Sequence, residues 1–168
     1  MYYSEILREF DTNSIRYLIV GGLSVNLHGI PRVTQDIDFI LSMDNDNLGK
    51  VLNILNNLGY TPQLPVFPED LLSSEKREFW IKEKNLKAFS FCNKHKSYMV
   101  VDILLVHPLD FEEAYKKRIV KNLKEYKIYL VSIEDLIKMK KYSGRSQDLS
   151  DIELLRKLQK FLGEDHEN

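Results

Sequence analysis

Two carboxylates one residue apart, in a run that otherwise reads as a buried strand, constrain this chain more than any other feature. The run is Thr34-Gln35-Asp36-Ile37-Asp38-Phe39-Ile40. Side chains alternate across a strand, so Asp36 and Asp38 share one face with their Cα atoms roughly 6.5 Å apart, and the apolar residues share the other face. Neighbouring carboxylates repel unless a cation lies between them, and Mg²⁺ is the simplest cation for a row of hard oxygens. The pair predicts a metal site.

A strand, a tight turn and a short helix are predicted directly upstream of this pair. The apolar strand Tyr17–Val20 stops at Gly21-Gly22, and residues 23–29 have the spacing of a short helix closed by glycine. Paired glycines let the backbone adopt positive φ and approach a ligand, and free N–H groups at a helix start favour phosphate. We expect Gly21, Gly22 and the Ser24 hydroxyl to bind phosphate. A plain turn is the alternative interpretation of a glycine pair.

A third carboxylate lies in the most apolar run of the chain, residues 98–106. An unpaired Asp102 in the middle of such a strand would be costly. If this strand lies beside the first, Asp102 completes a ligand set for two divalent ions roughly 3.5–4 Å apart, an arrangement that holds a nucleoside triphosphate for in-line displacement. Pairing of Asp102 with an arginine is the alternative.

Four further side chains are candidates for contact with a bound triphosphate. Arg32 and Thr34 alternate in phase with the two aspartates and so could face the phosphates, although Arg32 could equally neutralise the carboxylates. Lys140 and Arg145 bracket a predicted helix end, where cations favour the helix dipole with or without a ligand. We include all four among the candidate nucleotide-binding residues.

The order of these motifs resembles a known signature. Gly21-Gly22, then Asp36-Ile37-Asp38 and then Asp102 are similar to the motifs of the nucleotidyltransferase superfamily, whose fold resembles the palm of DNA polymerase β. The string GGLSVNLHGIPRVTQDIDFIL, with segments at 80–85 and 135–152, resembles a bacterial branch that includes AbiEii and MenT type toxins. The resemblance implies an enzyme that moves a nucleoside monophosphate from a nucleoside triphosphate such as ATP to a hydroxyl acceptor. It also implies that Asp36, Asp38 and Asp102 are catalytic and bind two Mg²⁺ or Mn²⁺ ions.

Alternating helices and strands predict an α/β (α+β) fold, a mixed sheet with flanking helices and a C-terminal helical tail. With the resemblance, we expect a palm-like nucleotidyltransferase core. At 168 residues the chain is expected to form a single domain over 1–168, with its core at about 14–131 and C-terminal helices at about 132–163. Three prolines predict a loop over residues 61–68, and a helix is expected over 71–84.

Composition excludes several classes of protein. Lys and Arg total 24 against 25 Asp and Glu, a formal net charge of −1, so the chain as a whole is not a polycation. Cys92 is the only cysteine of the sequence, which excludes an intrachain disulfide and a thiolate metal cluster. No apolar run approaches the roughly 20 residues of a membrane span, and no signal peptide opens the sequence. We expect a cytoplasmic protein with no membrane partner.

Three interpretations of the acceptor remain open. The first is a toxin-like enzyme that modifies RNA, above all tRNA, with a cognate antitoxin as protein partner; ten basic residues between 116 and 145 are a candidate RNA face. The second is a small-molecule nucleotidyltransferase of the lincosamide or aminoglycoside resistance type, from whose usual tryptophan and acidic residue Leu23 and Asn26 depart. The third is a catalytically silent nucleotide-binding or antitoxin module, against which the presence of all three aspartates argues.

Overall fold

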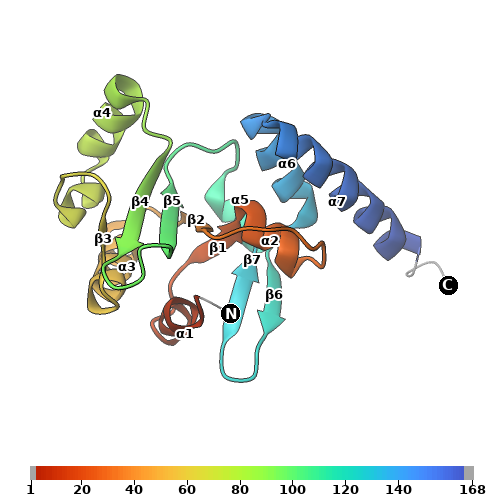
Figure 1. Ribbon diagram of the computed structural model, residues 1–168, viewed down its shortest axis with the longest axis horizontal. Helices are drawn as coiled ribbons and strands as arrows, with labels where there is room; N and C mark the ends of the chain where they lie inside the picture. The colour runs from red at the N-terminus through yellow and green to blue at the C-terminus, as the bar shows by residue number, and fades with distance from the viewer. Residues whose placement is uncertain (1–2, 165–168) are drawn as a thin grey trace.

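The computed structural model describes residues 3–164, which form a seven-stranded mixed sheet with helices on both faces (Figure 1). The strands lie in the order β3-β4-β5-β2-β1-β7-β6. They are β1 (Tyr17–Val20), β2 (Ile37–Leu41), β3 (Tyr60–Pro62), β4 (Ala88–Asn93), β5 (Val100–Leu104), β6 (Ile119–Asn122) and β7 (Lys127–Leu130). The helices are α1 (Ser4–Thr12), α2 (Gly21–Leu27), α3 (Asn45–Asn57), the 3₁₀ helix η1 (Pro68–Leu72), α4 (Ser74–Lys84), α5 (Phe111–Lys116), α6 (Ile133–Ser143) and α7 (Ser146–Glu164). This architecture confirms the predicted fold class.

Strand alternation divides the interior into two apolar cores, one on each face of the sheet. In β1, Tyr17 and Ile19 belong to the core that also contains residues of α1 and α3. Leu18 and Val20 belong to the opposite core, with residues of α2, α6 and α7. Both faces of a central strand are therefore buried, as its continuous apolar sequence predicts.

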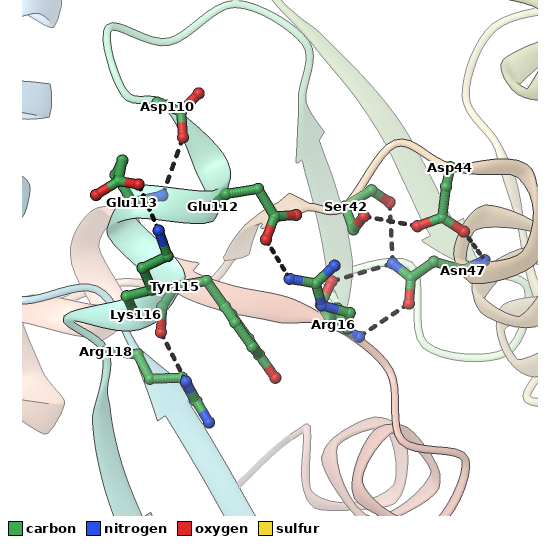
Figure 2. Close-up of polar contacts among 10 residues, drawn as sticks. All are labelled: Arg16, Ser42, Asp44, Asn47, Asp110, Glu112, Glu113, Tyr115, Lys116 and Arg118. Atoms are coloured by element: carbon green, nitrogen blue, oxygen red, sulfur yellow. Dashed lines mark hydrogen bonds and ion pairs between the residues drawn. The ribbon is translucent and has the colours of Figure 1, made fainter.

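The side chain of Asn47, at the start of α3, connects β1, β2 and α3 (Figure 2). Its Oδ1 accepts a hydrogen bond from the Arg16 N–H at 2.9 Å, and its Nδ2 donates to the carbonyls of Arg16 and Ser42, both at 3.0 Å. Asp44 caps the helix by accepting from the Asn47 N–H at 2.9 Å. These bonds satisfy backbone groups beside β1 and β2 and support the antiparallel register in which Val20 faces Asp38.

Helices α6 and α7 pack against each other beside the sheet, and α7 extends away from it toward the C-terminal end (Figure 1). Ser132 caps α6, because its hydroxyl accepts from the Asp135 N–H at 3.1 Å. Gly144 ends α6 with φ +66°, a conformation that favours glycine. The tight connection returns the chain so that the first turns of α7 lie against α6.

Two local expectations differ from the structure, and two elements were not expected. Thr61 and Pro62 belong to the short edge strand β3 rather than to a loop, since the antiparallel partner β4 holds them and an edge strand tolerates proline. The helix expected over 71–84 is divided into η1 and α4 at Ser73, whose hydroxyl caps α4. Helix α5 and strand β6 were not predicted individually.

Within residues 3–164, no helix combines the length and apolar character that crossing a bilayer requires.

Candidate active site

Asp38 and Asp102 occupy matching positions on two adjacent strands. β2 and β5 are parallel neighbours, and their register pairs Asp38 with Asp102. Adjacent strands lie about 4.8 Å apart, and residues in register point to the same face. The apolar residues Ile37, Phe39 and Val101 belong to the core on the other face. The structure therefore brings together two carboxylates that the sequence could place only on separate strands.

Gly21 lies where β1 ends, directly against the Asp38 carboxylate. A Cβ atom at Gly21 would lie 1.9 Å from Asp38 Oδ2, and Gly21 has φ +63°. Both the close approach and the positive φ require glycine. The turn that begins α2 therefore provides the space occupied by the Asp38 side chain.

The electrostatics of Asp38 and Asp102 favour a bound cation. Burial, followed by the charges of Asp102 and Asp36, raises the pKa of Asp38 to about 6. Burial also raises the pKa of Asp102, against the effect of a hydrogen bond from Ser90, and Asp102 Oδ1 is buried with no hydrogen-bond partner among residues 3–164. Arg145 and Lys140 only partly offset the repulsion at Asp38. A divalent cation would relieve the repulsion between these carboxylates and provide the missing partner of Asp102.

The described part of the chain, residues 3–164, contains no group of three His, Cys, Asp or Glu side chains that could hold a metal ion on its own. Asp36 is exposed in the segment before β2, whereas Asp38 and Asp102 are half-buried. Mg²⁺ is commonly held by one or two carboxylates together with substrate phosphates and waters. The donor set fits an ion that arrives with a nucleotide rather than one enclosed by protein alone.

A cavity of about 310 Å³ opens beside these carboxylates. Gly21, Asp38 and Asp102 line one side, and Lys140 and Arg145 of the α6–α7 region line another. An apolar wall is supplied by Ala88, Leu104, Val106, Pro108, Leu136 and Met139. Five of the ten candidate site residues thus border the same cavity.

The other predicted nucleotide-binding residues lie near α2. A Cβ atom at Gly22 would lie 2.8 Å from Thr34 Oγ1 and 3.1 Å from Arg32 Cζ, so this glycine accommodates the segment that leads into β2. Ser24 is fully buried, and its hydroxyl has no hydrogen-bond partner among the described residues. Gly22, Ser24, Arg32 and Thr34 do not line the cavity beside Asp38 and Asp102.

Lys140 and Arg145 have different environments. The Lys140 side chain is 4% exposed, and its ammonium contacts the carboxylates of both Asp148 and Asp151. The Arg145 side chain is 74% exposed and uses Nε to contact Asp148. Arg145 therefore retains further N–H groups for a ligand, whereas the Lys140 charge is already balanced.

Sequence reasoning missed several polar side chains of the cavity wall, among them Lys87 and His107. Burial lowers the pKa of His107, and its Nδ1 accepts from the Leu109 N–H at 3.3 Å. Both are isolated in the sequence, beyond any motif, so no spacing signal could have identified them. Only the pairing of β4 with β5 brings them to the site.

The profile of a protein family described as nucleotidyltransferase of unknown function (DUF6036) matches residues 3–159. The chain belongs to this family. It is accordingly a nucleotidyltransferase, as the motif order predicted. The finer likeness to the AbiEii and MenT branch remains a prediction, and a comparison with curated protein sequences finds no match.

Solved structures with the same fold include other nucleotidyltransferases. The lincosamide antibiotic adenylyltransferase LnuA, lincomycin-bound, has a TM-score of 0.56 and 20% identity, covering 91% of this chain and 93% of that chain. ANT(2″)-Ia in complex with adenylyl-2″-tobramycin has a TM-score of 0.55 and 12% identity, covering 94% and 91%. A candidate nucleotidyltransferase from Thermotoga maritima has a TM-score of 0.53 and 17% identity, covering 97% and 91%. At these identities the likeness establishes the shared fold.

Proposed function

We propose that this nucleotidyltransferase moves a nucleoside monophosphate from a Mg²⁺-bound nucleoside triphosphate, ATP among the candidates, to a hydroxyl acceptor. The observation that carries the proposal is the in-register pair of Asp38 and Asp102 beside the cavity, with a buried Asp102 oxygen that has no hydrogen-bond partner in the described part of the chain. Ser90 of β4 hydrogen-bonds the Asp102 carboxylate, but a purely structural carboxylate would have partners for both of its oxygens.

Asp36, Asp38 and Asp102 would hold one or two Mg²⁺ or Mn²⁺ ions, which supply charge neutralisation for the phosphates. Asp102 accepts the proton of the acceptor hydroxyl, whose oxygen then attacks the α-phosphorus. The bond from the α-phosphorus to the bridging oxygen breaks, and pyrophosphate leaves. Arg145, exposed at the cavity, contacts the phosphates, and the protein contributes mostly by positioning and charge neutralisation.

RNA, above all tRNA, is the first candidate acceptor. The structure reduces the predicted basic face, because Lys116, Lys138, Lys140 and Arg145 form ion pairs with acidic neighbours. The other six basic residues of this segment have no ion pair with any residue of 3–164, namely Lys117, Arg118, Lys121, Lys124, Lys127 and Lys141. On this interpretation the enzyme acts in the cytoplasm and has a cognate antitoxin, as the resemblance to the toxin branch implies.

A small hydroxyl compound is the second candidate acceptor, and the apolar cavity wall favours it. Six apolar residues beside a few convergent polar groups are typical of a small-molecule site. The fold shared with LnuA and ANT(2″)-Ia is compatible with this acceptor class. Leu23 and Asn26 stand where the lincosamide and aminoglycoside resistance enzymes usually have tryptophan and an acidic residue. This difference argues against membership of that resistance group, but not against a small acceptor.

The test is transfer of label from each α-³²P nucleoside triphosphate with Mg²⁺ to total RNA, to protein extract or to a panel of small alcohols. We expect one fraction to become labelled by the wild type and none by Asp38→Asn or Asp102→Asn. Asp46→Asn is the matched control, because Asp46 lies in an i, i+2 pair with Asp44 but pairs with Lys50 at the surface. Equal labelling by all four proteins would contradict the proposal.

If RNA is labelled, salt dependence identifies its contacts. Each lost phosphate contact should reduce the slope of log affinity against log salt by about one. Lys141→Gln should flatten the slope, whereas Lys138→Gln should have little effect because Lys138 is paired with Glu134 and Asp135. Weak binding that neither substitution changes, with a small alcohol labelled instead, would assign the enzyme to the second acceptor class.

A further inference from the structure

Five charged side chains form a continuous series of ion pairs between the segment before β2 and helices α6 and α7. Their order is Arg32, Asp151, Lys140, Asp148, Arg145. Lys140 Nζ lies 2.9 Å from Asp148 Oδ1 and 2.7 Å from Asp151 Oδ2. At the two ends, Arg32 Nη1 lies 2.5 Å from Asp151 Oδ2, and Arg145 Nε lies 3.0 Å from Asp148 Oδ2.

The centre of this series is buried. Lys140, Asp148 and Asp151 are 3%, 1% and 4% exposed. A charge at such a position is tolerated only when partners compensate it, and removal of one partner leaves the other uncompensated. The two aspartates share the lysine, and each also holds one arginine. Asp151 therefore has two cationic partners, of which Lys140 fixes it to α6.

Arg32 connects this series to the proposed metal site. It lies in the segment that delivers Asp36 and then Asp38 into β2. The Arg32 N–H donates to Asn26 Oδ1 at 2.7 Å, which holds the segment to α2. The Tyr3 hydroxyl donates to the Gln35 carbonyl at 2.5 Å, immediately before Asp36. Asp151 is the partner of this segment contributed by α7.

We propose that Asp151 is a positioning residue of the nucleotidyl transfer site, an inference that rests on the proposed function. Asp151 holds the Arg32 guanidinium and thereby fixes residues 32–36, the segment that presents Asp36 to the metal. Lys140 serves as the buried counter-ion that keeps Asp151 in place on α6. Asp151 itself contacts no reacting atom. The C-terminal helices contribute to catalysis by placing Asp36, in the segment that leads into β2.

The first measurement is amide hydrogen exchange on the nucleotide-free protein, which does not depend on any activity. Asp151→Asn and Arg32→Gln should each accelerate exchange at the residue 32 amide, whose N–H donates to Asn26 Oδ1, at least about tenfold, while β1 keeps its protection. The Arg32→Gln variant should still fold, because Asp151 remains paired with Lys140 and no buried charge is left without a partner. Glu153→Gln, which removes a surface pair with Lys157 on the same helix, is the matched control and should change nothing at 32–36.

The second measurement is the Mg²⁺ concentration that gives the half-maximal transfer rate. It should rise at least about tenfold in both Asp151→Asn and Arg32→Gln, because a misplaced Asp36 weakens metal binding, while KM for the acceptor stays unchanged. The double variant should be no worse than either single variant, since both break one contact.

Two outcomes would overturn the proposal. Faster exchange confined to α6 and α7 in Asp151→Asn would show that Asp151 only joins the helices. A metal or nucleotide defect in Arg32→Gln that Asp151→Asn does not share would show that Arg32 contacts the phosphates directly. If the wild type transfers no label at all, the proposed function fails, and the exchange experiment still decides whether Asp151 fixes residues 32–36.

Discussion

Asp102 has a buried carboxylate oxygen to which no residue of 3–164 donates a hydrogen bond, and burial raises the pKa of this residue. A group in this state destabilises the metal-free protein and becomes favourable only when a cation or proton reaches it. The same logic applies to Asp38, whose pKa of about 6 reflects burial and the adjacent Asp102 and Asp36 charges. At the scale of single residues, Asp38 and Asp102 therefore lower the stability of the metal-free protein and favour binding of a cation.

Asp102→Asn should therefore leave the metal-free protein at least as stable as the wild type while transfer falls by several orders of magnitude. The amide removes repulsion with Asp38 but is a weaker ligand for a hard cation. Urea unfolding and the labelling assay measure the two effects. Asp110→Asn is the control, because Asp110 caps α5 and asparagine caps equally well. A variant that loses several kcal/mol yet keeps its activity would identify Asp102 as a structural residue.

Tyr3→Phe tests a second residue that supports the site from a distance. The Tyr3 hydroxyl donates to the Gln35 carbonyl and accepts from the Val100 N–H at 3.2 Å, so it joins the segment before β2 to β5. Its loss leaves two backbone groups unpaired and should lower the free energy of unfolding by about 1–3 kcal/mol in urea titration. Tyr142→Phe, at an exposed ring, should change it by less than about 0.5 kcal/mol. Equal stability of Tyr3→Phe and wild type would contradict this role.

At the scale of elements, buried charge holds α6 and α7 together, and acid should weaken that attachment. Burial alone would raise the pKa of Asp148, but hydrogen bonds from Lys140 and Arg145 outweigh it and lower the pKa to about 2. The unfolded-state value is about 3.9. Since the folded-state pKa is the lower one, Asp148 contributes stability that is complete above about pH 4 and is lost as the pH falls toward 2.

The stability advantage of the wild type over Asp148→Asn should consequently shrink by roughly 2–3 kcal/mol between pH 5 and pH 2. Calorimetric unfolding of both proteins at several pH values measures it. Glu153→Gln provides the comparison, because its exposed pair with Lys157 contributes little. A stability advantage that does not change with pH would mean that the contacts with Lys140 and Arg145 do not stabilise the ionised form of Asp148.

The elements show which parts of the molecule sequence can predict. The alternation of Ile37, Asp38 and Phe39 specified the two faces of β2, because strand periodicity is local, whereas Asp36 lies before the strand and not within it. The pairing of Lys140 with Asp148 and Asp151 was not foreseen, since it depends on how two helices turn back on each other. Strand β3 was missed because Pro62 argues against a strand unless a partner such as β4 supplies the ladder.

At the scale of the whole molecule, the site unites β1, β2, β5 and the C-terminal helices around one cavity. A ligand that binds only this assembled arrangement stabilises the entire fold by mass action. A nucleoside triphosphate with Mg²⁺ at about 100 times its Kd should raise Tm by roughly 5–10 °C for a chain of this size.

The double variant Asp36→Asn, Asp38→Asn should abolish this rise in a thermal shift assay, and Asp46→Asn should retain it. Nucleotide without the divalent ion should give a much smaller shift, because the phosphates would then face uncompensated carboxylates. A full shift in the double variant would place the nucleotide elsewhere on the protein.

The parallel pairing of β2 with β5 has a consequence for the order in which the chain folds. Asp38 and Asp102 are far apart along the chain, and they meet only after the intervening α3, β3, α4 and β4 have been accommodated. Closing such a long loop is entropically unfavourable and slow compared with forming a hairpin. Nucleotide and metal therefore cannot guide the early steps of folding. A nascent chain remains catalytically inert until its sheet has closed around β5.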